Sequence, residues 1–266
     1  MSFFQVENIA ASYGNQQILF SISFGVEAGE IAGILGANGS GKTTLIKSIC
    51  GILPHAGMCI LDGERLDMLP PRRIAQRCSY IPQRSGIAIE LSALDVVLMG
   101  FNARLGLLEQ PNARMRASAL AALEQVGLKD RVHDNYLTLS EGQKQLCILA
   151  RALVSGSKAL LLDEPESALD FRHRHHILSL IRSWIDQEQR CALISLHDPQ
   201  LALSYCDRLL LINRGQIADV LRPKQDELPH MEAALRRLYG NIELVRCEDR
   251  CGKSHLVMLN EGEECT

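Results

Sequence analysis

The chain has 266 residues, of which 47% are hydrophobic and 22% charged, and its formal net charge is −3. This is the composition of an ordinary globular protein with a substantial apolar core, and it lacks the basic surplus typical of nucleic-acid-binding proteins, so we expect no nucleic-acid partner. The longest apolar runs are strand-sized, far below the roughly 18 residues that span a bilayer, and no basic residue precedes Lys42, so we expect neither a membrane span nor a targeting peptide.

The N-terminal region is predicted to form strands. Residues 3–35 consist of short apolar or alternating runs that are broken by turn signals at Gly14-Asn15 and Ala28-Gly29. The run "GMCILDGERL", residues 57–66, is typical of a further hairpin. We therefore expect an antiparallel β subdomain at this end of the chain.

A phosphate-binding loop lies between a predicted strand and a predicted helix. The segment "GANGSGKT", residues 36–43, fits the pattern G-x-x-x-x-G-K-[ST] at every fixed position. Its glycines let several backbone N–H groups point at a β-phosphate, while the following helix presents its positive end. Lys42 supplies a cation between the β- and γ-phosphates, and the hydroxyl of Thr43 is suited to hold Mg²⁺.

The second half of the chain alternates between strand and helix patterns. Residues 92–133 are mostly helical by pattern, and from residue 146 onward helices alternate with apolar strands, which predicts a mostly parallel sheet covered by helices. The strand "ALLLDEP" ends in Asp163, suited to Mg²⁺, and Glu164, suited to polarising a water. The strand "CALISLH" ends in His197, which can contact a γ-phosphate. These strand ends predict a hydrolytic nucleotide site.

The polar run "TLSEGQKQ", residues 138–145, begins another helix. Ser140 and Gln143 have the spacing of a capping box, so this helix start is a second anion site in the same chain. Glu141 adds negative charge there, which Lys144 is placed to offset. One phosphate loop and two anion-binding helix starts in one chain suggest a site completed by another copy.

These ordered motifs resemble the nucleotide-binding subunit of ATP-binding cassette (ABC) transporters over about residues 1–240. The matching segments are the Walker A loop (36–44), the Q-loop in "YIPQ" (80–83), the signature "LSEGQ" (139–143), Walker B in "LLLDEP" (160–165), the D-loop "SALD" (167–170) and the H-loop at His197.

The resemblance implies a fold and a set of site residues. The expected fold is α/β, a P-loop NTPase (RecA-like) core with an N-terminal antiparallel β subdomain and an inserted helical subdomain at 85–149, all within an ATPase domain of residues 1–240, followed by a hairpin-like tail at 241–266. The residues implied to bind ATP are Tyr13, Gly36, Asn38, Gly39, Ser40, Gly41, Lys42, Thr43, Thr44, Ser140, Gly142, Gln143 and Asp170. Those implied to act in hydrolysis are Glu164, His197 and Gln83, and those implied to hold Mg²⁺ are Thr43, Gln83 and Asp163.

Two further segments, "VLMG" (97–100) and "HDPQLALSYCDR" (197–208), resemble the subfamily that serves importers of iron chelates, haem and cobalamin. This implies an ATPase at the cytoplasmic face of a membrane, which works as a dimer of two copies with transmembrane permease subunits and, indirectly, a substrate-binding protein. A soluble ABC-type ATPase of iron–sulfur cofactor assembly remains an alternative.

Two clusters of metal-binding residue types remain. His173, His175 and His176 are interpreted as the solvated face of a helix. In the tail, Cys247, Cys251, His255 and Cys265 lack the usual C-x₂-C spacing of zinc sites, and a hairpin turn near Asp249 is favoured over a metal site.

Overall fold

The N-terminal strands form an antiparallel sheet, as predicted. A computed structural model describes residues 2–167, 169–186 and 189–260 of the chain. Strand β1 alternates between buried and more exposed positions, as expected for a sheet that packs one face on a core. The strand order is β2-β1-β4-β5, with β1 at Phe4–Tyr13, β2 at Gln16–Val26, β4 at His55–Leu61 and β5 at Glu64–Arg65.

The central sheet is mostly parallel, which confirms the prediction from the alternating pattern. Its order is β10-β9-β3-β8-β7-β6, formed by β3 (Ile31–Leu35), β6 (Cys78–Ile81), β7 (Ala159–Asp163), β8 (Cys191–Ser195), β9 (Arg208–Asn213) and β10 (Gln216–Leu221). Strands β3, β7 and β8 are buried at every residue because helices or the second sheet cover both faces.

The last apolar run of the alternating pattern forms two strands. Residues 208–217 have the pattern of a single strand, but the run divides into β9 and the start of the antiparallel β10. The backbone turns at Arg214 (φ 47°) and Gly215 (φ 75°), two left-handed residues that allow a tight hairpin.

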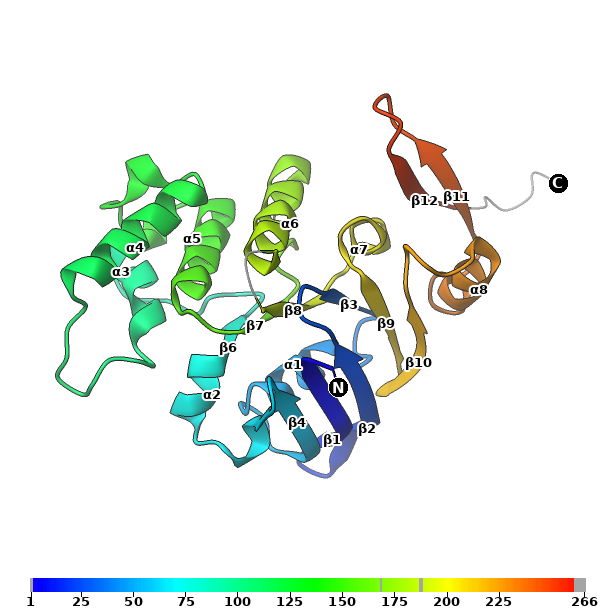
Figure 1. Ribbon diagram of the computed structural model, residues 1–266, viewed down its shortest axis with the longest axis horizontal. Coiled ribbons are helices and arrows are strands. Elements are labelled where there is room, and N and C mark those ends of the chain that lie inside the picture. Colours follow the sequence, from blue (N-terminus) through cyan, green and yellow to red (C-terminus); the bar gives the residue numbers. More distant parts are fainter. Residues whose placement is uncertain (1, 168, 187–188, 261–266) are drawn as a thin grey trace.

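The helices gather in groups around this sheet. α3, α4 and α5 pack together at one end of the molecule, and α6 stands between α5 and α7 (Figure 1). The predicted helical region at 92–133 is interrupted by turns and coil at 102–112. The bounds are α1 Lys42–Ile49, α2 Pro71–Arg77, α3 Ala93–Leu98, α4 Ala113–Gln125, α5 Glu141–Val154, α6 Phe171–Ile185, α7 Pro199–Tyr205 and α8 Leu228–Tyr239, with 3₁₀ turns at Leu66–Met68, Met99–Phe101, Lys129–Arg131 and Tyr136–Thr138. Within the described residues, none of these helices is long and apolar enough to cross a membrane.

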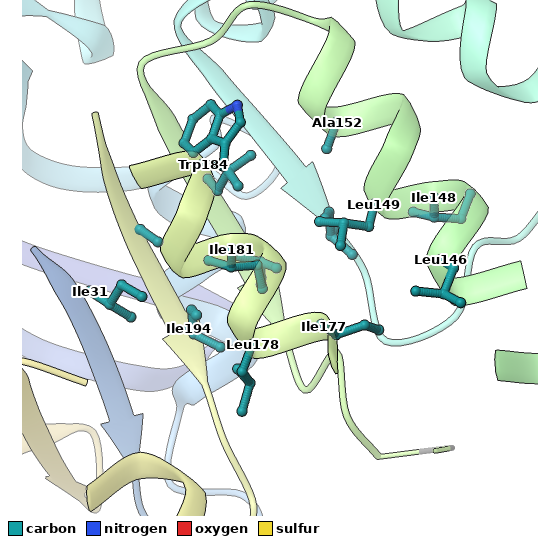
Figure 2. Packing of buried hydrophobic residues seen from close by; sticks show 14 of the residues in the cluster. Ile31, Leu146, Ile148, Leu149, Ala152, Ile177, Leu178, Ile181, Trp184 and Ile194 are labelled. Carbon is teal, nitrogen blue, oxygen red and sulfur yellow. The ribbon is translucent and has the colours of Figure 1, made fainter. Parts of the chain in front are cut away.

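The α5–α6 contact joins the helical group to the sheet. In Figure 2, Ile177 and Ile181 of α6 face Leu149 of α5, and Leu178 lies toward Ile194 of β8. All five side chains are at most 2% exposed, so α6 is buried against two layers at once. A movement of α6 therefore has to be shared with both neighbours.

The end of the described chain is an antiparallel hairpin of β11 (Ile242–Glu248) and β12 (Ser254–Asn260). It packs on α7 and α8 (Figure 1), and the Gln200 side chain on α7 donates to the Leu256 carbonyl (2.6 Å) and accepts from the Met258 N–H (3.0 Å). A separate unit at 241–266, with its boundary at 240, stays a prediction. The hairpin is nevertheless held to the body of the molecule by Gln200.

Gly100 permits a close approach between the 3₁₀ turn Met99–Phe101 and α5. A Cβ atom at this position would lie 2.2 Å from the carbonyl oxygen of Arg151 and 2.7 Å from a methyl of Val154. We expect Gly100→Ala to lower the free energy of unfolding by about 1–3 kcal/mol, measured by urea denaturation, since backbone has to shift. The control is Gly106→Ala, whose added Cβ meets its nearest atom at 3.5 Å. Equal losses in the two variants would contradict this account.

Candidate functional site

The phosphate loop connects β3 to α1 and is shaped by its glycines. Gly39 (φ 78°) and Gly41 (φ 109°) adopt left-handed conformations that favour glycine. At Gly36 a Cβ would lie 2.3 Å from the carbonyl oxygen of Ile212, so a side chain has no room there. No side chain caps the first turn of α1, and no acidic residue lies in it. Its N–H groups are therefore available to an anion.

Asp163, the last residue of β7, joins the start of α1 to the end of β8. Its Oδ1 accepts hydrogen bonds from the Thr43 hydroxyl (3.0 Å), in the first turn of α1, and from the Ser195 hydroxyl (2.8 Å), the last residue of β8. Asp163 is only 4% exposed, so these two donors replace water around its charge. The carboxylate is thereby fixed beside the phosphate loop.

Glu164 follows directly in a strained conformation. Its φ is 48°, which is uncommon for a residue with a side chain and is found often at functional sites. The Glu164 N–H donates to the Ser195 carbonyl (3.1 Å) and hydroxyl (3.0 Å), and these bonds hold the turn. The Gln83 amide donates to Glu164 Oε2 (2.9 Å), while Lys42 Nζ lies 3.9 Å from Oε1. The carboxylate is thus oriented by two side chains.

A cavity of about 730 Å³ opens over these residues. Its lining residues are Ile18, Asn38, Gly39, Gly41, Lys42, Thr43, Thr44, Gln83, Glu164, Glu166, Ser167, Arg174, His197 and Asp198. Nine of these lining residues are among the site residues that the sequence predicts. The volume lies within the range of small-molecule sites.

Other expected residues lie outside this lining. Gly36, Ser40 and Asp163 belong to the loop and strand behind it, and Tyr13, at the end of β1, is 48% exposed. Ser140, Gly142, Gln143 and Asp170 do not line the cavity of their own chain. Ala168, in the predicted D-loop, lies outside the described residues.

The start of α5 has the geometry that its sequence predicts. The Ser140 side chain accepts from the Gln143 N–H (3.3 Å), and the Gln143 side chain accepts from the Ser140 N–H (3.0 Å), which completes a capping box. Lys144 forms an ion pair with Glu141 (2.8 Å) and offsets its charge. Ser140 and Glu141 are exposed, so this helix start faces solvent in the single chain.

Sequence reasoning missed three polar residues at the site. The only signal for Ser195 is a hydroxyl in an otherwise apolar strand. Glu166, which gave no signal, is 1% exposed; its Oε1 accepts from the His197 N–H (2.9 Å), and its Oε2 has no partner among the described residues. Arg174, one turn into α6, reaches the cavity lining while its Nε donates to the Leu169 carbonyl (2.7 Å).

The side-chain oxygens of the site are suitable ligands for a divalent cation such as Mg²⁺. Thr43 offers a hydroxyl, Asp163 a carboxylate and Gln83 the carbonyl oxygen of an amide whose nitrogen is already engaged with Glu164. Mg²⁺ prefers such hard oxygen ligands, few in number, together with substrate phosphates. No group of three or more His, Cys, Asp or Glu suited to a metal occurs within the described residues.

The two histidine and cysteine clusters have other contacts. His173 pairs with Asp170 (2.8 Å), and His175 contacts the Tyr205 hydroxyl (2.9 Å). In the tail, His255 pairs with Asp249 (2.9 Å), and Cys247 and Cys251 are free and exposed. Cys265 lies outside the described residues.

Comparisons with known proteins agree with this geometry. A family profile described as ABC transporter matches residues 19–167. The hemin import ATP-binding protein HmuV of Pseudomonas entomophila is 36% identical over 252 residues, which are 91% of this chain and 94% of the relative. An iron chelatin transport ATP-binding protein of Helicobacter pylori is 34% identical over 210 residues, 78% of this chain and 82% of the relative.

Among solved structures, a metal-chelate type ABC transporter in an inward-facing conformation is similar with a TM-score of 0.82 and 25% identity, over 98% of this chain and 99% of that chain. The likeness therefore extends beyond the residues matched by the family profile.

Burial of Glu166 makes folding depend on pH. Burial raises the pKa of Glu166 from its ordinary 4.5 to about 7, and the hydrogen bond from the His197 N–H offsets this only in part. The folded protein thus binds this proton more tightly than the unfolded chain does, and the resulting stability is present below pH 4.5 and lost as the pH rises through 7. From pH 5 to pH 8 we expect wild-type protein to lose ~2–3 kcal/mol more unfolding free energy than Glu166→Gln.

The measurement is urea denaturation of the nucleotide-free protein across this pH range. Glu248→Gln, on the exposed face of the tail hairpin, is the control and should follow the wild type. Parallel curves for wild type and Glu166→Gln would show that Glu166 is ionised in the folded state at pH 5.

Proposed function

The chain belongs to the ABC transporter family, and from this premise we propose that it is the ATP-hydrolysing subunit of an importer for an iron chelate, haem or a cobalamin-like compound. The main support for ATP hydrolysis is that Thr43, Asp163 and Ser195 converge beside the phosphate loop. The carboxylate of Glu164 is oriented next to them by Gln83. The substrate class is supported by the relatives, which are named for hemin and iron-chelatin transport, and by the metal-chelate type structure that matches nearly the whole chain.

ATP binding is proposed to use the loop and the exposed ring at the end of β1. Phosphate oxygens would accept from the N–H groups of the loop and from Lys42, whose Nζ now donates to the Gly36 carbonyl (2.9 Å). Tyr13, exposed and in a position that matches the family's aromatic residue, would stack on adenine. Mg²⁺, held by Thr43, Gln83 and Asp163, would neutralise phosphate charge.

Hydrolysis is proposed to depend on Glu164. Its carboxylate lies on the cavity wall and would accept a hydrogen bond from the attacking water. The Gln83 amide holds one carboxylate oxygen in place, and Ser195 holds the backbone that carries it. His197, also on the wall, would contact the γ-phosphate.

The second half of each ATP site is proposed to come from another copy. Ser140, Gly142 and Gln143 do not line the cavity of their own chain, yet they form an exposed helix start that favours an anion. A head-to-tail dimer would place this helix start and Asp170 against the γ-phosphate in the partner's cavity. ADP, which lacks that phosphate, would not hold the dimer closed.

A membrane partner is proposed to bind near Gln83. Large apolar side chains are exposed in the segment that follows it: Ile89 is 64% exposed, Leu107 99% and Leu108 95%. Exposure of several large apolar side chains between residues 84 and 112 favours a protein partner for this segment. We propose that this partner is a permease, which would place the chain at the cytoplasmic face of the membrane, with a substrate-binding protein acting through the permease.

The alternative, a soluble ATPase of iron–sulfur cofactor assembly, would bind soluble partners instead. Affinity purification from detergent-extracted membranes separates the two. A stoichiometric, very hydrophobic partner supports the importer; quantitative recovery in the soluble fraction with a soluble partner supports the alternative.

Glu164→Gln should retain ATP binding and lose turnover by at least about 100-fold, because the water loses its proton acceptor. Binding is measured by calorimetry and turnover by phosphate release. The matched control, Glu248→Gln on the tail hairpin, should hydrolyse ATP normally. A normal rate for Glu164→Gln would mean that another group activates the water.

A mixture of variants tests the composite site. Lys42→Ala removes the cation of one half-site, and Ser140→Arg blocks the other. A mixed dimer of these two variants has one site with both lesions and one intact site. We expect each variant alone to be nearly inactive and purified mixed dimers, isolated through two different tags, to regain part of the activity.

The control pairs a chain carrying both substitutions with a wild-type chain. Each of its sites then has one lesion, so it should stay inactive although it contains the same two substitutions. Higher activity of this control than of the first mixed dimer would contradict the composite site, because its wild-type chain would then carry a complete site of its own. Inactivity of both kinds would mean that two intact sites are needed together. The Ser140→Arg helix loses its cap, so its unfolding is compared with wild type by circular dichroism.

A further inference from the structure

A second cavity of about 760 Å³ lies between α6, the end of α7 and the tail hairpin. Figure 1 shows the hairpin beside α7 and α8, at the opposite end of the molecule from α3 and α4. This cavity shares no lining residue with the ATP cavity. It is therefore a separate place in the fold, and its chemistry is not explained by ATP hydrolysis.

The lining of this cavity is basic. It contains Arg182, Lys224, Arg246 and Lys253, together with His175 and His255, and no Asp or Glu is among the described residues that line it. The hydroxyls of Ser179, Ser204 and Ser254 add hydrogen-bond donors. Positive charges from α6, the turn after β10 and the hairpin thus meet around one space.

One half-buried carboxylate binds two of the cations. Asp207 accepts from Arg182 Nη2 (2.5 Å) and from Lys224 Nζ (2.7 Å), and Arg182 Nη2 also donates to the Tyr205 carbonyl (2.9 Å). Asp207 itself is anchored by the Ile31 N–H (3.0 Å) and is not part of the lining. Arg182 Nη1 also lies 3.8 Å from the carboxylate of Asp186, which like Asp207 is outside the lining. These two carboxylates balance Arg182 and Lys224, so the positive surplus of the lining comes from the hairpin.

The hairpin supplies the other two cations. Within the described residues, neither Arg246 nor Lys253 has an ion-pair partner, although both line the cavity. The turn that carries Lys253 is rigid because the Asp249 carboxylate accepts from the N–H groups of Cys251 (2.8 Å) and Lys253 (3.0 Å). Like charges held together in this way favour an anion between them.

We propose that this cavity binds a small soluble polyanion bearing phosphate or carboxylate groups, which Arg246 and Lys253 on the hairpin and Arg182 and Lys224 on the core hold between them. Its volume is that of a small-molecule site, and its cations come from two separate parts of the fold. The bound anion links the hairpin to α6, the helix whose first turn carries Arg174 on the ATP cavity.

Calorimetry with inorganic pyrophosphate and with citrate tests the proposal. The parent protein carries Lys42→Ala, so that the phosphate loop does not compete, and the buffer contains no Mg²⁺. We expect one-to-one binding that weakens at least about tenfold when Arg246 and Lys253 are both changed to Gln, since each loses a charge-assisted hydrogen bond. Arg250→Gln, an exposed cation of the same hairpin outside the lining, should leave the affinity unchanged.

Two results would overturn it. In the first, the parent protein binds neither pyrophosphate nor citrate. In the second, the parent protein and the variant with both Arg246 and Lys253 changed to Gln bind the anions with equal affinity. Circular dichroism melting confirms that the exposed substitutions leave the fold intact.

Two further experiments distinguish a soluble anion from two other sources of phosphate or carboxylate groups, a lipid headgroup and the chain's own C-terminal residues. Flotation with vesicles of phosphatidylglycerol and phosphatidylcholine tests a lipid headgroup. If the protein binds these vesicles through Arg246 and Lys253 but binds neither pyrophosphate nor citrate, the ligand is a membrane and not a soluble anion.

A chain that ends at Asn260 lacks Glu261, Glu263 and Glu264, whose carboxylates resemble those of citrate. Unchanged anion affinity in this shorter chain supports a soluble ligand, whereas binding that appears only there assigns the site to the chain's own end.

Discussion

The site depends on one carboxylate oxygen. Asp163 Oδ1 accepts from the Thr43 hydroxyl in the first turn of α1 and from the Ser195 hydroxyl at the end of β8, so the ends of β7 and β8 and the start of α1 meet at a single buried carboxylate. The phosphate loop, the turn at Glu164 and the end of β8 cannot move independently while these bonds hold. Such pre-organisation suits the catalytic role proposed for Glu164, because a catalytic carboxylate has to be placed before the reaction begins, not during it.

The proposed two-copy ATP site follows from where its parts lie in the single chain. Glu164, Gln83 and His197 lie on one cavity wall, but the capped start of α5 is exposed elsewhere on the chain. Helix α6 connects these regions, since it packs on α5 along one face and on the sheet along another (Figure 2). A partner that presses on the helical group therefore acts on α6 as well, and through it on the neighbourhood of the ATP site.

The tail hairpin adds a third region that meets α6. Gln200 holds the middle of β12, and the hairpin side chains Arg246 and Lys253 line a cavity that α6 also lines. The helix thus packs on the helical group and the sheet, and it shares the wall of the basic cavity with the hairpin.

The sequence by itself determined the features that depend on local chemistry. The phosphate loop requires glycines at fixed spacing, the capping box requires Ser140 and Gln143 three residues apart, and uniformly apolar strands predict a parallel core; all of these follow from short segments. Only the tertiary structure decided that Ser195 bridges Asp163 and Glu164, that Glu166 is buried with one oxygen that has no partner in the described part of the chain, and that Arg182 and Arg246 line one cavity. The reason is that these relations join residues far apart in the chain, and burial and convergence of charge arise only when separate segments pack together.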